Sequence, residues 1–600
     1  MAMEEFLDVD EFVGELITGG GKHSGQLLQY LYELQYRYSC IPPRAIELLA
    51  KQLQLPVARI HGVIEFYSFL HATPRGAYDI LFSDSITDHM LGSRERLAEL
   101  CQRLGVQLGI PRADGRVTVD VTSCTGICDQ GPALLVNGWA VAGLDAHRIE
   151  AIAALVEAGT PVTDWPQEFF DIQDNVQRRD LLLTDTDGAG DALQALRERG
   201  ADALLDELDA SGLRGRGGAG FKTATKWRFC RAAEAGQRYV VCNADEGEPG
   251  TFKDRVLLNS YADSVFEGMT LCAGLIGASQ GYLYLRGEYR HLRAPLEALL
   301  EQRREAGLLG SNILGQDGFD FDISIHMGAG AYVCGEESAL IESLEGKRGI
   351  PRKRPPFPVT NGYRNLPTVV NNVETFMAAA RIAAAGADWF CAAGTGQSTG
   401  TKVLSISGDC SRPGIYEYPF GVSIAQILED CGGTDAQAVQ VAGAAGSTIP
   451  ASEFGRSIAF EDCATAGSLM VFGPQRDLLD MVQNFAHFFV HESCGFCTPC
   501  RVGGALLKDL VDKVCAGRAG DYDLQEMQAI GDLMRHTSHC GLGATASNPV
   551  LDTLQKFPEI YRQRLAGGDY GPSFDLDAAL AEARAITGRD DAAAHLKVES

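Results

Sequence analysis

The sequence is short of basic residues. Lys and Arg together number 52 against 79 Asp and Glu, so the formal net charge is −27. A protein that binds nucleic acid through its phosphates needs a basic surface, which this balance disfavours. We therefore expect no nucleic-acid partner.

Long apolar runs and targeting signals are also lacking. Apolar stretches such as 269–276 are interrupted long before the roughly 18 residues that a membrane span requires. Residues 1–10 are acidic and lack the positive start and apolar segment of a secretory signal. The 17 cysteines, an odd number in 600 residues, are too sparse for a disulfide scaffold. We expect a cytoplasmic protein whose cysteines are thiols or metal ligands.

The length predicts several domains, about three to five at roughly 100–200 residues each. Changes in hydrophobic period, glycine content and turn residues mark where one type of structure gives way to another. We predict a multidomain α/β chain with these parts: a helical bundle (1–75), a small α/β unit (76–160), a linker (161–187), a glycine-rich α/β domain (188–398), a β-rich module (399–476), a helical domain (477–565) and a tail (566–600) with one helix and a flexible end.

Four cysteines form the most specific motif. Cys494, Cys497 and Cys500 are separated by two residues each, and Cys540 follows later. Three soft thiolates at this spacing can hold one face of an inorganic cluster, and a distant fourth completes the set. A four-cysteine zinc site is the alternative, but zinc sites usually pair their ligands two and two. We predict a 4Fe-4S cluster.

A glycine-rich loop lies in the second α/β region. Residues 211–221 contain five glycines and two arginines. Backbone without Cβ can approach a phosphate closely, and its N–H groups can bind the oxygens. The loop does not end in Gly-Lys-Ser/Thr, so it is not a Walker A motif. A disordered arginine–glycine segment is the alternative.

Three carboxylates follow the predicted strand 239–241. They are Asp245, Glu246 and Glu248, within the run 243–250. Beside a phosphate-binding loop, carboxylates indicate hydrogen bonds to hydroxyls, ring nitrogens or an amide, as in a ribityl chain or a nicotinamide. A solvated acidic turn is the alternative.

These motifs, with three more in the same order, resemble the NADH-oxidising flavoprotein family of respiratory complex I. The further motifs are 328–337, 355–358 and 371–375, and the resemblance extends over 201–559. It implies an FMN-binding fold that departs from the common dinucleotide pattern, a ubiquitin-like β-grasp module and a helical 4Fe-4S domain.

The resemblance also assigns residues by position. Around FMN it implies Gly215, Arg216, Gly217, Gly218, Lys226, Asn243, Asp245, Glu246, Tyr332, Gly335, Glu336, Asn371, Asn372 and Thr375. For NAD it implies the aromatic walls Phe221, Phe229 and Phe357, Arg354 where the family usually has lysine, and the catalytic carboxylates Glu248 and Glu337 at the nicotinamide. The implied 4Fe-4S ligands are Cys494, Cys497, Cys500 and Cys540.

The first 160 residues resemble the small thioredoxin-like 2Fe-2S subunit that accompanies this flavoprotein. Two of its four ligands correspond to Cys124 and Cys128, but the other two positions hold Ser83 and Asp88, with His89 adjacent. We expect either no cluster or an unusual ligand set that includes Ser83 or His89.

A fusion of these two subunits points to the diaphorase subunits of soluble NAD-reducing hydrogenases. Such a subunit moves electrons between a 4Fe-4S cluster and NAD+/NADH through FMN by hydride transfer. Its partners would be an iron–sulfur subunit and nickel–iron hydrogenase subunits, since this chain lacks the paired C-x2-C motifs of a nickel–iron site. The alternatives are the same module in an NAD-dependent formate dehydrogenase or a fused complex I, and an electron-bridging subunit without nucleotide turnover.

Overall fold

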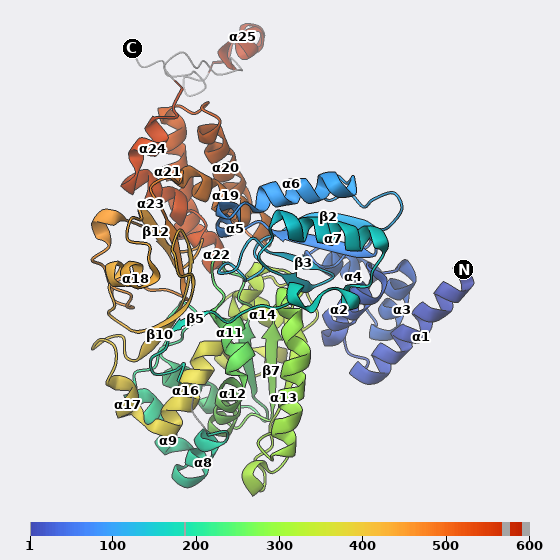
Figure 1. The fold of residues 1–600 in the computed structure, drawn as a ribbon, viewed down its shortest axis with the longest axis vertical. Helices are drawn as coiled ribbons and strands as arrows, with labels where there is room; N and C mark the ends of the chain where they lie inside the picture. Colours follow the sequence, from blue (N-terminus) through green and yellow to red (C-terminus); the bar gives the residue numbers. More distant parts are fainter. Residues whose placement is uncertain (1, 185–187, 567–575, 591–600) are drawn as a thin grey trace.

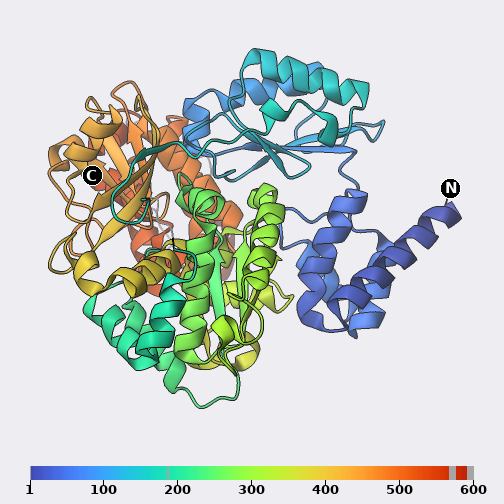
Figure 2. The same ribbon diagram turned by 60° about the horizontal axis from the view of Figure 1, so that its bottom comes forward.

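The computed structural model describes residues 2–184, 188–566 and 576–590. Figures 1 and 2 show the central α/β domain with the N-terminal helices on one side and the β-grasp module on the other. The helical domain and the thioredoxin-like domain lie next to each other at one end of the molecule (Figure 1). Among the described residues, no helix combines the length and the apolar character that crossing a bilayer requires.

The N-terminal helices are α1 (Ala2–Gly20), α2 (Leu27–Tyr38), α3 (Pro43–Leu53) and α4 (Val57–Ile64). Proline is well placed at the start of α3, because the first helical N–H has no partner within a helix. The leucines of α2 that recur at helical spacing are buried. They share one core with Tyr239 and Val241 of the central sheet, so this bundle covers one face of that sheet.

The thioredoxin-like domain has the sheet order β2-β1-β3-β4. Its elements are β1 (Tyr78–Ser83), α5 (Ile86–Met90), α6 (Ser93–Leu104), β2 (Val117–Thr122), β3 (Leu134–Val136), β4 (Trp139–Val141) and α7 (Ala146–Ala158). Helices α6 and α7 share one apolar core with alternate residues of β1 and β2. The mixture of strands and helices agrees with the small α/β unit predicted here.

The segment predicted as a linker, 161–187, is partly built into another sheet. Strand β5 (Val176–Arg178) pairs in parallel with β11 of the β-grasp module. The buried carboxylate of Glu417 then accepts the backbone N–H groups of Asp180, Leu182 and Leu183 at 2.8, 2.6 and 2.9 Å. This described part of the segment is therefore not a free connector, because strand pairing and a buried carboxylate hold it.

The central domain is built on a parallel sheet in the order β8-β7-β6-β9. Its strands are β6 (Tyr239–Ala244), β7 (Gln280–Leu285), β8 (Asp322–Met327) and β9 (Thr368–Asn372). Its helices are α8 (Asp191–Arg199), α9 (Ala201–Ala210), α10 (Thr223–Ala232), α11 (Lys253–Ser260), α12 (Ala262–Ile276), α13 (Arg293–Glu305), α14 (Glu337–Leu344), α15 (Pro358–Asn361), α16 (Val373–Ala385) and α17 (Ala387–Cys391).

The first strand, β6, lies inside this sheet between β7 and β9. From β6 the chain continues to β7 and β8 on one side, and it later returns to β9 on the other side. The carboxyl ends of β6 and β9 therefore form a topological switch point, where ligands bind in open α/β sheets. This is a common doubly wound strand order. The departure from the dinucleotide pattern lies in the glycine loop, which precedes α10 and β6 and does not follow the first strand.

The β-grasp module contains β10 (Thr401–Gly408), β11 (Gly414–Pro419), α18 (Ile424–Cys431), β12 (Ala438–Val441), β13 (Ser447–Pro450) and β14 (Ser468–Phe472). The hairpin of β10 and β11 leads into α18, and β14 returns parallel to β10. Segments 442–445 and 464–466, which lie between strands of this module, pack at the carboxyl end of the central sheet.

The helical domain contains α19 (Leu478–Glu492), α20 (Thr498–Cys515), α21 (Asp521–Thr537), α22 (Gly541–Thr545), α23 (Asn548–Lys556) and α24 (Pro558–Arg562). One further helix, α25 (Leu576–Thr587), lies in the predicted tail. The flexible end predicted for that tail falls in 591–600, outside the described residues.

Candidate functional site

A cavity of about 530 Å³ opens at the carboxyl ends of β6 and β9. Three parts of the chain form its wall: the central domain, loops 442–445 and 464–466 of the β-grasp module, and the start of α22. Most residues predicted around the flavin line it, namely Gly217, Gly218, Asn243, Asp245, Glu246, Tyr332, Gly335, Glu336 and Asn372, and so does Glu248, which was predicted at the nicotinamide. Motifs up to about 155 positions apart in the chain thus meet in one place.

The side chain of Arg216 does not face this cavity. Its guanidinium is buried between Phe390, Phe420 and Phe460, with the carbon Cζ 4.8 Å from the Phe420 ring centre. The guanidinium donates to the Arg214 carbonyl of the loop at 3.0 Å, and the Arg216 N–H donates to Thr375 Oγ1 at 2.9 Å. The family resemblance implies Arg216 around FMN, but its positive charge is held away from this cavity.

Lys253 supplies a cation to the cavity and was missed by the sequence analysis. Its ammonium lies 2.5 Å from Asp254 Oδ1 and 3.1 Å from both Asn372 Oδ1 and Glu374 Oε2. The sequence signal was weak, because Lys253 lies just beyond the acidic run 243–250 in an otherwise ordinary helix start.

The carboxylates after β6 have different environments. Glu246 accepts the N–H groups of Asp254 and Arg255 at 2.8 and 3.1 Å, so it caps the start of α11. Asp245 also lines the cavity, and its Oδ2 atom is buried without a hydrogen-bond partner. Burial raises the pKa of Asp245 well above its ordinary value. An unpartnered buried oxygen at this place is suited to a ligand that donates a hydrogen bond.

Glycine allows a close approach of the backbone at two places beside the cavity. A Cβ on Gly217 would lie 3.1 Å from Asn372 Cβ, and one on Gly335 would lie 3.4 Å from the Asp245 carbonyl oxygen. The bare backbone, the Lys253 cation and the unpartnered Asp245 oxygen together fit a phosphorylated cofactor with hydrogen-bond donors on its ring. FMN has these groups, and we refer to this space as the flavin cavity.

Glu248 lies on the wall beside the β-grasp module. Its carboxylate accepts the Tyr332 hydroxyl at 2.5 Å and the Ala445 N–H at 2.9 Å. Burial raises the pKa of Glu248 to about 7, although these two hydrogen bonds act in the opposite direction. Its charge therefore changes near neutral pH.

Glu337 lies outside this wall, at the start of α14, in a small network of charges. Lys226 Nζ donates to Glu337 Oε2 at 2.8 Å, and Arg354 Nη1 lies 3.2 Å from Glu336 Oε1 and 3.8 Å from Glu337 Oε1. Arg354 thus keeps the positive charge that lysine usually provides in the family. Lys226 also donates to the Val370 carbonyl at 2.7 Å, so α10 is tied to β9.

Three predicted aromatic walls are exposed to solvent. The exposed fractions are 54% for Phe221, 54% for Phe229 and 52% for Phe357. Phe229 lies on α10 and Phe357 directly precedes α15, and these two helices pack together. Exposed phenyl rings fit an adenine that stacks.

Asn371 and Gly215, two further residues predicted around the flavin, make hydrogen bonds within the protein. The Trp227 indole donates to Asn371 Oδ1 at 2.9 Å, and Gly215 N–H donates to the Phe221 carbonyl at 2.9 Å. These contacts shape the loop and the sheet edge, and neither Asn371 nor Gly215 lines the cavity.

The four cysteines of the predicted cluster line one small cavity with Val333, Ser493, Phe496 and Leu542. Cys497 precedes α20, Cys500 lies in its first turn, and Cys540 precedes α22. All four are free thiols. Four thiol ligands around an apolar space fit a 4Fe-4S cluster.

The two cavities share walls. Val333 and Leu542 line both the flavin cavity and the cysteine cavity. A cofactor in one cavity would therefore be separated from a cluster in the other by single side chains.

The proposed 2Fe-2S ligands of the thioredoxin-like domain do not fit a cluster. Asp88 Oδ2 accepts the hydroxyls of Ser83 and Ser85 at 2.6 and 2.8 Å, and its Oδ1 accepts the Ala133 N–H at 3.0 Å. The ring of His89 pairs with Asp84, Nε2 to Oδ1 at 2.7 Å. Ser83 and Asp88 are thus engaged with each other, and the two remaining cysteines are too few to hold the cluster.

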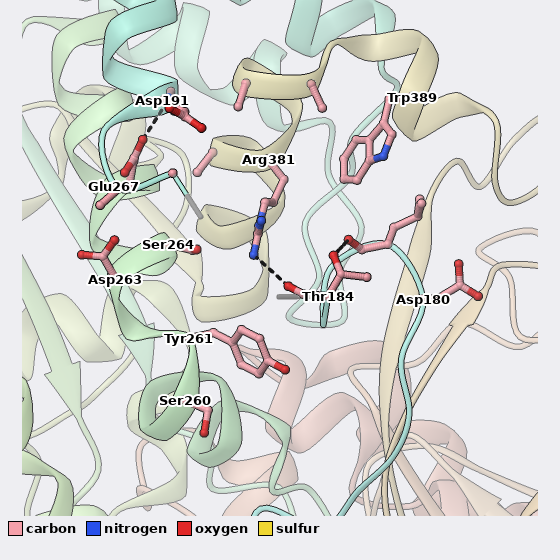
Figure 3. Close-up of a pocket in the computed structure, with 17 residues that line it drawn as sticks. Asp180, Thr184, Asp191, Ser260, Tyr261, Asp263, Ser264, Glu267, Arg381 and Trp389 are labelled. Carbon is pink, nitrogen blue, oxygen red and sulfur yellow. Dashed lines mark hydrogen bonds between the residues drawn. The ribbon is translucent and has the colours of Figure 1, made fainter. Parts of the chain in front are cut away.

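A larger cavity of about 670 Å³ lies elsewhere, between α8, α12, α16 and α17 (Figure 3). Arg381 points into it and donates to the Thr184 carbonyl at 3.4 Å, while Asp180, Asp263 and Glu267 also line it. Its predominantly acidic lining disfavours a flavin phosphate, and no predicted site residue lines it. We therefore assign cofactor binding to the smaller cavity.

Comparison with protein-family models gives three matches along the chain. Residues 13–157 match the thioredoxin-like [2Fe-2S] ferredoxin, 208–381 match the Nuo51 FMN-binding domain, and 480–564 match the iron–sulfur binding region of NADH-ubiquinone oxidoreductase-F. These matches confirm the predicted FMN and 4Fe-4S domains. The first identifies the fold of the N-terminal domain, whose ligand positions differ here as described above.

Two similar proteins agree with these matches. The HoxS subunit alpha of the NAD-reducing hydrogenase of Cupriavidus necator is 44% identical over 573 residues, which cover 92% of this chain and 95% of the relative. One subunit of the NADH-quinone oxidoreductase of Aquifex aeolicus is 39% identical over 382 residues, covering 63% of this chain and 89% of the relative.

A solved structure is also similar over nearly the whole chain. A chain of the crystal structure of an NAD+-reducing [NiFe]-hydrogenase in the H2-reduced state has a TM-score of 0.86 and 44% identity, covering 96% of this chain and 99% of that chain. The identity, the coverage and the three domain matches place this chain in the family of the alpha subunits of NAD-reducing hydrogenases.

Proposed function

We propose that this chain is the diaphorase subunit of an NAD-reducing hydrogenase and moves electrons between NAD(H) and a 4Fe-4S cluster. The shared wall of Val333 and Leu542 carries this proposal, because it places a flavin-sized cavity directly beside the four-cysteine cavity. Bound FMN supplies the exchange between two-electron and one-electron transfer.

The residues of this chain bind and orient the reactants. The glycine loop and Lys253 hold the phosphate end of FMN, and Asp245 accepts a hydrogen bond from its ring or ribityl chain. Phe221, Phe229 and Phe357 stack the adenine of NAD(H). Glu248, held by Tyr332 and Ala445, and Glu337, held by Lys226, position the nicotinamide amide.

Dye reduction by NADH tests the enzymatic part. We expect the purified, FMN-loaded chain to reduce an artificial acceptor with NADH, because every element of the nucleotide site lies on this chain. No dye reduction by such a sample would contradict the diaphorase function and favour an electron-bridging role.

Co-purification tests the partner. We propose a hetero-oligomer with an iron–sulfur subunit and nickel–iron subunits, in keeping with the relative from Cupriavidus necator, which is one subunit of a hydrogenase, and with the similar structure of a [NiFe]-hydrogenase. A complex that lacks a nickel–iron subunit and contains a formate-oxidising one would favour the alternative module. We also propose a cytoplasmic location, which the unbridged thiols of Cys124, Cys128 and Cys391 support.

A further inference from the structure

The thioredoxin-like domain keeps two cysteines side by side where its fold family holds a cluster. Cys124 and Cys128 are exposed by only 0% and 2%, and their sulfur atoms lie 3.5 Å apart. Asp88, held by two serine hydroxyls and a backbone N–H, fills the neighbouring position. The pair is therefore a buried dithiol without further cysteine ligands in the described part of this domain's site.

The loop that carries the dithiol touches the support of the flavin cavity. The carbonyl of Cys124 accepts Arg286 Nη2 at 2.7 Å, and Arg286 Nη1 donates to the carbonyl of Glu246 at 2.5 Å. Tyr289 donates to Glu246 Oε2 at 2.8 Å, and a Cβ on Gly126 would collide with the Tyr289 ring. Two buried side chains thus connect the loop 124–128 directly to Glu246.

We propose that Cys124 and Cys128 are a redox-active dithiol that closes to a disulfide on oxidation by a peroxide, and that closure alters the flavin cavity through Arg286 and Tyr289. The sulfur atoms must approach from 3.5 Å to a bond of about 2.0 Å. Gly126, with a φ of 72°, lies at the turn between them and has no spare space against Tyr289. The movement of the loop therefore reaches the two side chains that hold Glu246.

The reaction balances with hydrogen peroxide as the oxidant. One cysteine sulfur attacks a peroxide oxygen, so the O–O bond breaks, a sulfenic acid forms and the first water leaves. The second thiol then attacks the sulfenic sulfur, the S–S bond forms and the second water leaves. The two thiols lose two protons and two electrons, and the peroxide is reduced to two waters.

Mass spectrometry of the full FMN-loaded chain tests the disulfide. After hydrogen peroxide treatment, free thiols are alkylated in denaturant and the chain is digested. We expect the peptide with Cys124 and Cys128 to lose both alkyl groups and to regain them after dithiothreitol. Full alkylation of both cysteines after oxidation, or analytically measured iron in excess of the 4Fe-4S content, would overturn the proposal.

The flavin absorption band tests the coupling. We expect a shift of the band on oxidation that dithiothreitol reverses, is lost in C128S and is kept in C391A, a control that removes an exposed cysteine. A reversible shift that persists in C128S, or a disulfide without any shift, would refute the coupling. The mass measurement needs no variant, so it stands even if C128S fails to fold.

Any effect of the altered flavin cavity on NADH oxidation rests on the proposed function, whereas formation of the disulfide does not. A chain that forms the disulfide and lacks dye reduction would contradict the proposed function alone. A chain that reduces the dye and never forms the disulfide would contradict this inference alone.

Discussion

Replacing Glu374 by glutamine should destabilise the central domain strongly. Glu374 is fully buried at the start of α16, and its carboxylate contacts Lys402 Nζ, lies 3.1 Å from Lys253 Nζ and 4.0 Å from Arg216 Nε. These three cations are each exposed by 2% or less. Asp254 also contacts Lys253, and Glu246 acts on Lys253 at longer range, so E374Q removes the one carboxylate that all three cations share.

The cost follows from the uncompensated charge. Removing one partner of a buried ion pair costs about 3–5 kcal/mol. Replacing Lys402 by methionine should cost less, because burial lowers the pKa of Lys402 to about 7 and Glu374 keeps Lys253 and Arg216 as partners. The double variant E374Q/K402M should be more stable than the sum of the two single effects predicts, by about 0.5–3 kcal/mol.

Urea unfolding followed through release of FMN fluorescence measures these differences in free energy. E559Q is the matched control, because it removes an ion pair with Arg562 whose side chains are 68% and 63% exposed, and it should change stability by less than about 0.5 kcal/mol. If E374Q lies within about 1 kcal/mol of the wild type, or if the single effects simply add, the charge argument is wrong.

Three further predictions concern the site. The wild-type KM for NADH should fall as pH rises through about 7, because Glu248 must lose its proton to accept the nicotinamide amide. E248Q should abolish this pH dependence. An identical dependence in both proteins would rule this role out. F229A should raise the KM for NADH roughly 5- to 150-fold with little change in kcat, since one stacking contact contributes about 1–3 kcal/mol. Steady-state kinetics that show an unchanged KM would exclude adenine stacking on this ring. C497A should remove the 4Fe-4S signal from the electron paramagnetic resonance spectrum of the reduced protein and leave NADH-to-dye reduction measurable, and an unchanged spectrum would contradict the ligand assignment.

Short runs of residues were sufficient to predict the cofactor chemistry. The spacing of Cys494, Cys497 and Cys500 and the glycines of the loop 211–221 place the required atoms within a few residues of one another. Local spacing therefore predicts them without knowledge of the fold. The family resemblance supplied the assignment of individual residues, and the domain matches confirmed the cofactors that it implied.

The direction of side chains and the meeting of distant segments could not be predicted in this way. Arg216 turns away from the flavin cavity because the rings of Phe390, Phe420 and Phe460 surround its guanidinium. Contacts with Asn372 and Glu374 hold the Lys253 ammonium at the cavity. Strand β5 joins a sheet whose other strands begin more than two hundred residues later. Each of these results depends on contacts between segments far apart in the chain, and such contacts leave no periodic or local signal in the sequence.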